Sequence, residues 1–167
     1  MVRFFGSLKV AGLLLVASTL AACSTTEPPT APVTPTQPSA SAIKPGTAED
    51  FRVNVGDTVF FDLDQHALRA DAQVVLQKQA AWLQKFPAVK LVVEGHCDER
   101  GTREYNLALG DRRAYAVKEY LVSLGIDAAR LQTKSYGKER PVCAESDENC
   151  WQQNRRGYSV ILSGASS

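Results

Sequence analysis

Apolar and polar residues alternate along the chain with two different periods, and these periods predict strands and helices. Phe51 to Val55 alternates, Thr58 to Asp62 is rich in β-branched and aromatic residues, and Gly56-Asp57 lies between them. This arrangement predicts a β-hairpin. Residues 68–86 carry apolar side chains at helical spacing and are followed by Pro87, so we expect a helix that ends there.

The second half of the chain continues the alternation of strand and helix. Val89 to His96 is predicted to be a strand, and Arg103 to Leu124 the longest helix. Its apolar stripe is predicted to contain Leu107, Ala114, Val117, Leu121 and Leu124. Two further strands are expected at residues 131–137 and 157–162, with a short helical turn near Trp151 to Asn154 in the polar loop between them. The order of elements predicts an α+β fold, a two-layer α/β sandwich whose mixed sheet is covered by helices on one face.

The first residues follow neither period and predict an export signal. An apolar run at residues 10–20 is too short to span a bilayer, which needs roughly 20 apolar residues. It ends in Leu20-Ala-Ala-Cys23, which resembles the bacterial lipobox. The resemblance implies a signal peptide at residues 1–22, acylation of Cys23 and, since Ser24 follows, an outer-membrane location with the domain in the periplasm. The alternative is an ordinary secretory signal that a cysteine follows by chance.

Six of the eight prolines lie between Ser24 and Asp50, among Thr, Ser and Ala residues. Such a composition cannot bury a core and favours the extended polyproline II conformation. At ~3.1 Å per residue this segment would extend on the order of 80 Å. We therefore expect a lipidated tether at 23–50, a folded domain at 51–163 and a disordered tail at 164–167. A disordered segment without a mechanical role would have the same composition.

Charge argues against nucleic acid as a partner. The formal net charge is +1, and removing Arg3 and Lys9 with the signal peptide leaves 17 basic against 18 acidic residues. A nucleic-acid-binding domain usually clusters Lys and Arg on one face. Any charged ligand must therefore be recognised by a few placed side chains.

The segment between the second predicted strand and the long helix carries the candidate chemistry. It resembles the signature of OmpA-like peptidoglycan-binding domains at Asp98, Gly101, Asn106, Leu109, Arg113 and Ala114. Three more motifs resemble this family in the expected order: Phe61-Asp-Leu-Asp64, Ser135-Tyr-Gly137 and Asn154-Arg-Arg156. The resemblance covers residues 53–162, nearly the whole expected domain.

The resemblance implies a binding site for meso-diaminopimelate, whose free end carries one carboxylate and one ammonium on the same carbon. Arg113 offers a planar fork for the carboxylate, and Asp98 is an acceptor for the ammonium. By the same resemblance, the site also includes Leu63, Asp64, Asn106 and Arg155. Neither Asp98 nor Arg113 is assigned to the core. The alternative for this pair is a structural surface ion pair worth ~0–1 kcal/mol.

The segments Glu94-Gly-His96 and Asp98-Glu-Arg-Gly-Thr102 are most similar to the lipoprotein members of this family, which bind the periplasmic protein TolB. The resemblance implies TolB as a partner, with Glu94, His96 and Glu99 on the contact surface. For His96 a structural role is an equal alternative. Arg112 is expected to be a solvated surface residue, and His66 a surface residue or a cap-like contact near the start of the first helix. A lipoprotein that links envelope to wall without a Tol partner is the alternative function.

Six residues separate Cys143 from Cys150 in one polar loop of an exported protein, which predicts a disulfide. Cys97 stands where the family usually has a small residue, and we expect a buried, inert thiol. The chain has no Ser-His-Asp, phosphate-loop or HExxH motif and no zinc-ligand spacing, so no catalytic residue, cofactor or metal is expected. An enzyme, for example a cell-wall hydrolase, stays as the second class of function.

Overall fold

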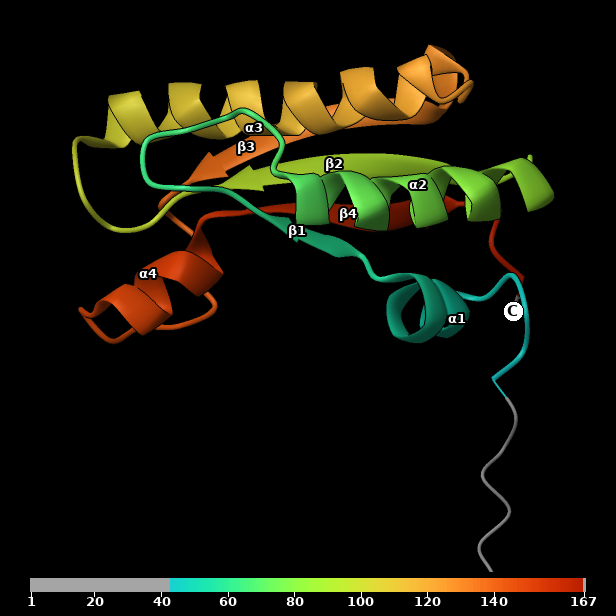
Figure 1. Cartoon of the computed structure of the whole chain (residues 1–167), viewed down its shortest axis with the longest axis horizontal. Helices are drawn as coiled ribbons and strands as arrows, with labels where there is room; N and C mark the ends of the chain where they lie inside the picture. Colours follow the sequence, from blue (N-terminus) through green and yellow to red (C-terminus); the bar gives the residue numbers. More distant parts are fainter. Residues whose placement is uncertain (1–42, 167) are drawn as a thin grey trace, which may run out of the picture. The chain divides into compact units, whose positions relative to one another are not determined.

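A computed structural model describes residues 43–166, and its centre is a four-stranded sheet (Figure 1). The signal peptide, Cys23 and most of the expected tether lie outside these residues. The strands are β1 (Thr58–Phe60), β2 (Lys90–His96), β3 (Leu131–Gly137) and β4 (Arg156–Ser163), in the order β1-β4-β2-β3. β2 runs parallel to β3, and β4 is antiparallel to both β1 and β2. The expected mixed sheet is therefore confirmed.

Two long helices, α2 (Ala70–Lys85) and α3 (Arg103–Ser123), cover one face of this sheet (Figure 1). Alternate residues of β2, Leu91 and Val93, are fully buried beneath them, as the two-residue period of a strand requires. α3 connects the parallel strands β2 and β3, which need such a crossover. Both helices and the last three strands were predicted to within two residues at each end.

The buried stripe of α3 begins at a different residue from the one predicted. Leu107 is exposed, and Leu109 is buried in its place, ahead of Val117 and Leu121. The polar side chain of Asn106 and the charged side chain of Arg113 also lie on the buried face. Because polar residues occupy buried positions here, the apolar pattern alone misplaced the start of the stripe.

The predicted hairpin at residues 51–62 is wrong. The chain instead forms helix α1 (Ala48–Asp50), which continues into the π-helix η1 (Phe51–Val55), and β1 pairs with β4. Apolar residues at 51, 53 and 55 fit a strand, but Phe51 and Val55 also stand one helical turn apart. In the structure Phe51 is buried and Val53 is exposed, so only the helical period is used.

The chain before residue 51, which we assigned to the tether, is partly built into the fold. The buried carboxylate of Asp50 accepts hydrogen bonds of 2.8 Å from each of Trp82 Nε1, Gly46 N–H and Asn54 Nδ2. These three bonds offset the cost of burying the carboxylate. At the other end of the chain, Ser166 N–H donates to Gly46 O over 2.9 Å, so the expected disordered tail also contacts the domain.

The remaining elements are the 3-10 helix η2 (Ala128–Arg130) and helix α4 (Glu148–Asn154). α4 begins three residues before the helical turn that we predicted, because Asp147 caps its first turn by accepting from Cys150 N–H. The predicted disulfide joins Cys143 and Cys150, and Cys97 is a buried free thiol, as predicted. Within residues 43–166, no helix is long and apolar enough to cross a membrane.

Two glycines bring α3 into direct contact with the sheet. A Cβ atom at Gly95 would lie 1.8 Å from the carbonyl oxygen of Gly110, and one at Gly110 would lie 2.4 Å from Ser135 Oγ. Only glycine permits such a close approach between a helix and a strand. The first turns of α3 are thereby held against the end of β2, where the candidate site lies.

Candidate functional site

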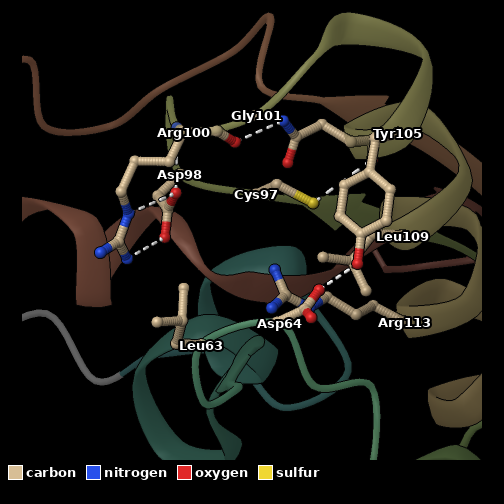
Figure 2. Close-up of a pocket in the computed structure, with 10 residues that line it drawn as sticks. Leu63, Asp64, Cys97, Asp98, Arg100, Gly101, Tyr105, Leu109 and Arg113 are labelled. Carbon is tan, nitrogen blue, oxygen red and sulfur yellow. Dashed lines mark hydrogen bonds and ion pairs between the residues drawn. The ribbon is translucent and has the colours of Figure 1, made fainter.

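A pocket of about 220 Å³ lies where the loop after β2 folds back over the first turns of α3 (Figure 2). A second loop, between β1 and α2, closes its other side. Five of the six residues predicted to bind ligand line this pocket: Leu63, Asp64, Asp98, Asn106 and Arg113. The sixth, Arg155, contacts it through a bond to Asp98.

Arg113 is fully buried, which contradicts the expectation that it lies outside the core. Its guanidinium donates to three backbone carbonyls, with Nε 2.8 Å from Gln65 O, Nη1 2.8 Å from His96 O and Nη2 3.0 Å from Asp62 O. A guanidinium has five N–H groups, so two are not bonded to a carbonyl. The guanidinium also contacts the thiol of Cys97 in the pocket wall. Burial lowers the pKa of Arg113. The three carbonyls hold the charged group in one fixed plane.

Asp98 is also buried, and its partners are Arg100 and Arg155 rather than Arg113. Its Oδ2 lies 2.7 Å from Arg100 Nη2 and 3.2 Å from Arg155 Nη1. Burial raises the pKa of Asp98, but hydrogen bonds from the side chain and backbone of Arg100 and from Arg155 outweigh it. The net effect lowers the pKa of this carboxyl below its ordinary value, so it is ionised at neutral pH. The alternative of an ion pair between Asp98 and Arg113 is not what the structure contains.

Asn106 shapes the loop between Asp98 and the start of α3, as the family resemblance implied. Asn106 Nδ2 donates to Arg100 O over 2.7 Å and to Thr102 O over 2.9 Å. Gly101 adopts a φ of 86°, a conformation that L side chains rarely adopt. Thr102 then caps α3 by accepting a hydrogen bond from Tyr105 N–H over 3.2 Å.

Three pocket residues were missed by the sequence analysis: Arg100, Tyr105 and Cys97. The hydroxyl of Tyr105 donates to Asp64 across the pocket, joining its two sides (Figure 2). Cys97 Sγ donates to Asn106 O over 3.3 Å, and burial raises the pKa of its thiol, so the thiol stays protonated. Arg100 follows Asp98 by two residues within the segment Asp98-Glu-Arg-Gly-Thr102 that resembles the family, but no role was predicted for it.

His96 does not lie on a surface where a partner could contact its side chain. It is 1% exposed, its ring stacks on Tyr136 with centroids 5.4 Å apart, and Nε2 lies 3.4 Å from Glu94 Oε2. Burial, with smaller contributions from Arg156 and Arg140, lowers the pKa of His96 to about 4. The ring is therefore neutral at neutral pH, and its structural role is the one that the geometry supports.

Glu94, which was also predicted to contact TolB, is largely buried, because only 15% of its side chain is exposed beside His96. The remaining surface predictions concern exposed residues. Glu99 is exposed on the loop beside the pocket, and its Oε1 accepts from Trp151 Nε1 over 2.9 Å. Arg112 and His66 are exposed, as predicted. Within the part of the chain that the structure describes, no three His, Cys, Asp or Glu side chains gather as metal ligands would.

The site can therefore bind a small group that carries both charges. A buried carboxylate and a buried guanidinium face one pocket, and neither neutralises the other. Leu63 is 54% exposed beside the pocket and Leu109 is buried in its wall, so both offer apolar contact.

Comparisons with known proteins identify the family of the chain and its fold. Residues 60–155 match the OmpA family. The chain is 58% identical over 128 residues to the peptidoglycan-associated lipoprotein of Mesorhizobium japonicum, covering 77% of this chain and 76% of that protein. It is 40% identical over 161 residues to the protein of the same name from Haemophilus influenzae, covering 92% and 95%. The crystal structure of the peptidoglycan-associated lipoprotein from Burkholderia pseudomallei superposes with a TM-score of 0.62 at 42% identity, covering 64% of this chain and 90% of that one.

Proposed function

Because the chain belongs to the OmpA family, and within it to the peptidoglycan-associated lipoproteins, we propose that its domain binds the diaminopimelate of peptidoglycan between Asp98 and Arg113. The observation that carries the proposal is the pairing of two buried, opposite charges that line one pocket without neutralising each other. Diaminopimelate presents an ammonium and a carboxylate on one carbon, and this pair of charges complements the pocket.

The carboxylate binds to the two N–H groups of Arg113 that no carbonyl occupies. Bonds to Asp62 O, Gln65 O and His96 O fix the plane of the guanidinium before the ligand arrives. Little side-chain freedom is then lost on binding, which favours affinity. A lysine at this position would keep the charge but lose the planar fork.

The ammonium binds to Asp98, which shares its oxygens with Arg100 and Arg155. The carboxylate is ionised over the whole neutral range because its pKa is lowered. Leu63 and Leu109 contact the methylene chain of the ligand. The domain binds the wall in this way without cutting it.

Acylated Cys23 anchors the chain in the outer membrane, and the domain faces the periplasm. The Pro-rich segment after it lets the domain reach the peptidoglycan. The protein thus links outer membrane to wall, supporting envelope integrity and membrane constriction at cell division.

Co-sedimentation with purified sacculi tests the site. Asp98→Asn removes the charge that receives the ammonium, and a charge-assisted hydrogen bond contributes ~1.5–3 kcal/mol, so binding should weaken on the order of tenfold or more. Asp111→Asn is the matched control, because Asp111 is exposed on α3 away from the pocket lining. Full binding by folded Asp98→Asn would contradict the site, and release of soluble wall fragments would instead support the hydrolase alternative.

We further propose TolB as a partner within the Tol–Pal system, with Glu99 as the contact residue on the pocket loop. Because Glu99 is exposed beside Asp98, TolB and peptidoglycan would bind the same loop and compete for it. Each would lower the affinity of the protein for the other by the same factor. The measurement is TolB affinity with and without a saturating diaminopimelate muropeptide, for the unmodified protein and Glu99→Gln. Independent binding of both partners would contradict competition, and no binding of TolB would favour an envelope link without a Tol partner.

A further inference from the structure

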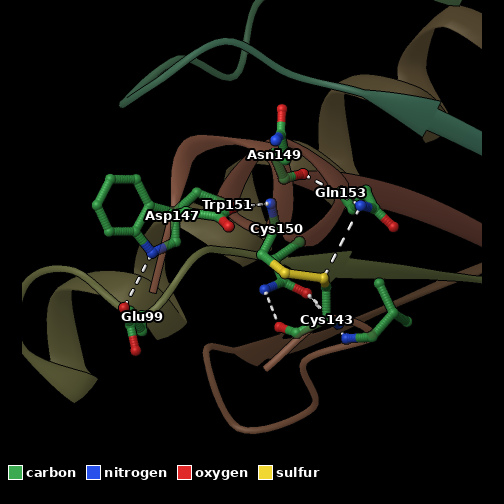
Figure 3. Close-up of a disulfide and its surroundings, with 9 residues drawn as sticks. Glu99, Cys143, Asp147, Asn149, Cys150, Trp151 and Gln153 are labelled. Atoms are coloured by element: carbon green, nitrogen blue, oxygen red, sulfur yellow. Dashed lines mark hydrogen bonds between the residues drawn. A yellow bond between two sulfur atoms is a disulfide. The ribbon is translucent and has the colours of Figure 1, made fainter. Parts of the chain in front are cut away.

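Two sets of contacts, a disulfide and a pair of hydrogen bonds, join α4 to the loop that precedes it and so close this segment. The disulfide joins Cys143, before the helix, to Cys150 within it (Figure 3). Asn154, the last residue of α4, closes the same segment by hydrogen bonds: its Oδ1 accepts from Val142 N–H over 2.8 Å, and its Nδ2 donates to Cys143 O over 2.7 Å. α4 is therefore held at both ends by contacts within residues 142–154.

The closed segment reaches the pocket loop through two side chains of α4, Trp151 and Glu148. Trp151 Nε1 donates to Glu99 Oε1 over 2.9 Å (Figure 3), and the guanidinium carbon of Arg100 lies 4.1 Å from the centre of a Trp151 ring. Glu148 lies 2.6 Å from Arg155 Nη2 and 3.9 Å from Arg100 Nη1. Both arginines that bond to Asp98 therefore rest on α4.

Arg100 is the link between this helix and the ligand-binding carboxylate. Its Nη2 lies 2.7 Å from Asp98 Oδ2 and its Nε 3.1 Å from Asp98 Oδ1, a bidentate contact (Figure 2). The side chain of Arg100 is 34% exposed, so Asp98 alone does not fix its position. A long, partly exposed side chain keeps one rotamer when stacking on an aromatic ring adds to an ion pair.

We propose that Trp151 and Glu148 are positioning residues for ligand binding, and that the Cys143–Cys150 disulfide, by holding them, makes affinity for the ligand depend on its redox state. The inference rests on the proposed function, in which Asp98 receives the ligand ammonium. Without the Trp151 ring, Arg100 loses its stacking partner, and Glu99 loses one of its donors and keeps Ser146. The orientation of the Asp98 carboxylate then varies, and the pocket is less complementary to the ligand.

The first experiment measures binding of a diaminopimelate-containing muropeptide to the full chain by calorimetry. Trp151→Ala should weaken binding on the order of threefold to tenfold, as expected for a cation–π contact of this kind. Trp151→Phe keeps a ring for Arg100 and should retain most of the affinity. Tyr115→Ala, which removes an exposed aromatic residue of α3, is the matched control and should bind as the unmodified protein does.

A double-mutant cycle tests the route through Arg100. If Trp151 acts on Asp98 by holding Arg100, Trp151→Ala should cause no further loss in a chain that already carries Arg100→Ala. An unchanged loss in that background would overturn this route. Thermal unfolding of all four proteins is measured alongside. A variant that binds weakly but unfolds at the same temperature as the unmodified protein has lost positioning and not folding.

The pKa of Asp98 gives a readout that needs no ligand. The carboxyl carbon signal of Asp98 is followed by nuclear magnetic resonance as pH falls. Because Arg100 contributes to the lowered pKa of this carboxyl, the pKa should rise in Trp151→Ala and stay low in Trp151→Phe. An unchanged pKa in Trp151→Ala would overturn the inference, whatever the state of the proposed function.

The redox part is tested on the same chain with the disulfide opened. Reduction by a phosphine and the double substitution Cys143→Ser with Cys150→Ser should weaken muropeptide binding by a similar factor and raise the pKa of Asp98. If both forms stay folded and bind as tightly as the oxidised protein, the redox dependence is overturned. If the unmodified oxidised protein binds no muropeptide, the proposed function itself fails, while the Asp98 titration still decides the positioning role.

Discussion

Asp98 and Arg113 line one pocket but are not bonded to each other. Asp98 is bonded to two arginines, and Arg113 to three backbone carbonyls. The two charged residues hold different parts of the structure in place. Asp98 holds side chains near the surface, whereas Arg113 joins the loop between β1 and α2 to the end of β2. Substitutions at the two positions should therefore have different consequences.

Arg113→Ala should lower the free energy of unfolding by about 3–5 kcal/mol, the usual effect of removing one partner from a buried charged contact. It leaves the carbonyls of Asp62, Gln65 and His96 without their donor and opens a cavity beneath α3. Urea unfolding followed by circular dichroism measures the change. Arg112→Ala, on the exposed neighbour, should stay within about 0.5 kcal/mol of the unmodified protein. Equal stability of the two variants would show that the three bonds do not hold the loop.

The contact between Asp50 and Trp82 should stabilise the start of the domain. Asp50→Ala leaves the Trp82 N–H unpaired in a buried place, and we expect a loss of about 1–3 kcal/mol in urea unfolding. Glu49→Gln, at the exposed neighbour in the same helix, is the control. A chain that starts at Phe51 should show at least the loss of Asp50→Ala, and normal stability of that truncated chain would place the domain boundary where the sequence suggested.

The same contact should make stability depend on acid. Hydrogen bonds from Trp82 first, then from Asn54 and Gly46, lower the pKa of Asp50 below its ordinary value of 3.8. A carboxyl with a lowered pKa contributes stability that is fully present above that ordinary value and is lost as pH falls through the folded pKa. Below pH 4, the free energy of unfolding should therefore fall more steeply with decreasing pH in the unmodified protein than in Asp50→Asn. Parallel curves would argue against an ionised carboxylate at this position.

His96 should give a second pH dependence at milder acidity. Its pKa is lowered from 6.5 to about 4, so the unfolded chain takes up a proton across this interval while the folded chain does not. Stability is therefore fully present above pH 6.5 and is lost as pH falls towards 4, by about 3 kcal/mol at most. His96→Asn should lack this decline, whereas His66→Asn, at an exposed position, should keep it. A decline in the His96→Asn protein equal to that of the unmodified protein would assign it to other groups.

The lipid anchor is predicted from sequence alone and has a direct test. Mass spectrometry of protein extracted from membranes should show a chain that begins at Cys23 and carries a lipid-sized increment. Cys23→Ser should leave the outer-membrane fraction, because a chain without acyl groups has no stable hold on a bilayer. Recovery of this variant in that fraction at normal levels would contradict the anchor.

The long helices were predictable from sequence, whereas the segment before β1 was not. α2 and α3 each repeat the helical period over several turns, so their limits followed from the apolar positions. Phe51 to Val55 is only five residues long, and over that length an alternating pattern also fits one helical turn. Tertiary contacts decided between the two periods, because Phe51 packs against Trp82 with ring centroids 4.9 Å apart.

The sequence predicted which residues line the site, but not their burial or their hydrogen-bond partners. The family motifs identified Asp98, Asn106 and Arg113, and all three line the pocket. A sequence places arginine at the surface by default, and burial of Arg113 depends on carbonyls that lie up to 51 residues away in the chain. The contact of Arg100 with α4 is likewise tertiary, since Trp151 lies far along the chain and no local pattern connects them.

Under the proposed function, the Asp50–Trp82 contact would also carry mechanical load. Gly46 is bonded to Ser166 just beyond the end of β4 that pairs with the start of β2. The pocket is lined by residues that follow the other end of β2. If the chain links membrane to wall as proposed, a pull between them would enter the domain at one end of the sheet and leave at the other. β1 pairs with β4 along its whole length and would resist this pull in shear, whereas α1 is held by a few bonds to Asp50. We expect stretching to release α1 first, lengthening the tether under tension while the pocket keeps its grip on the wall.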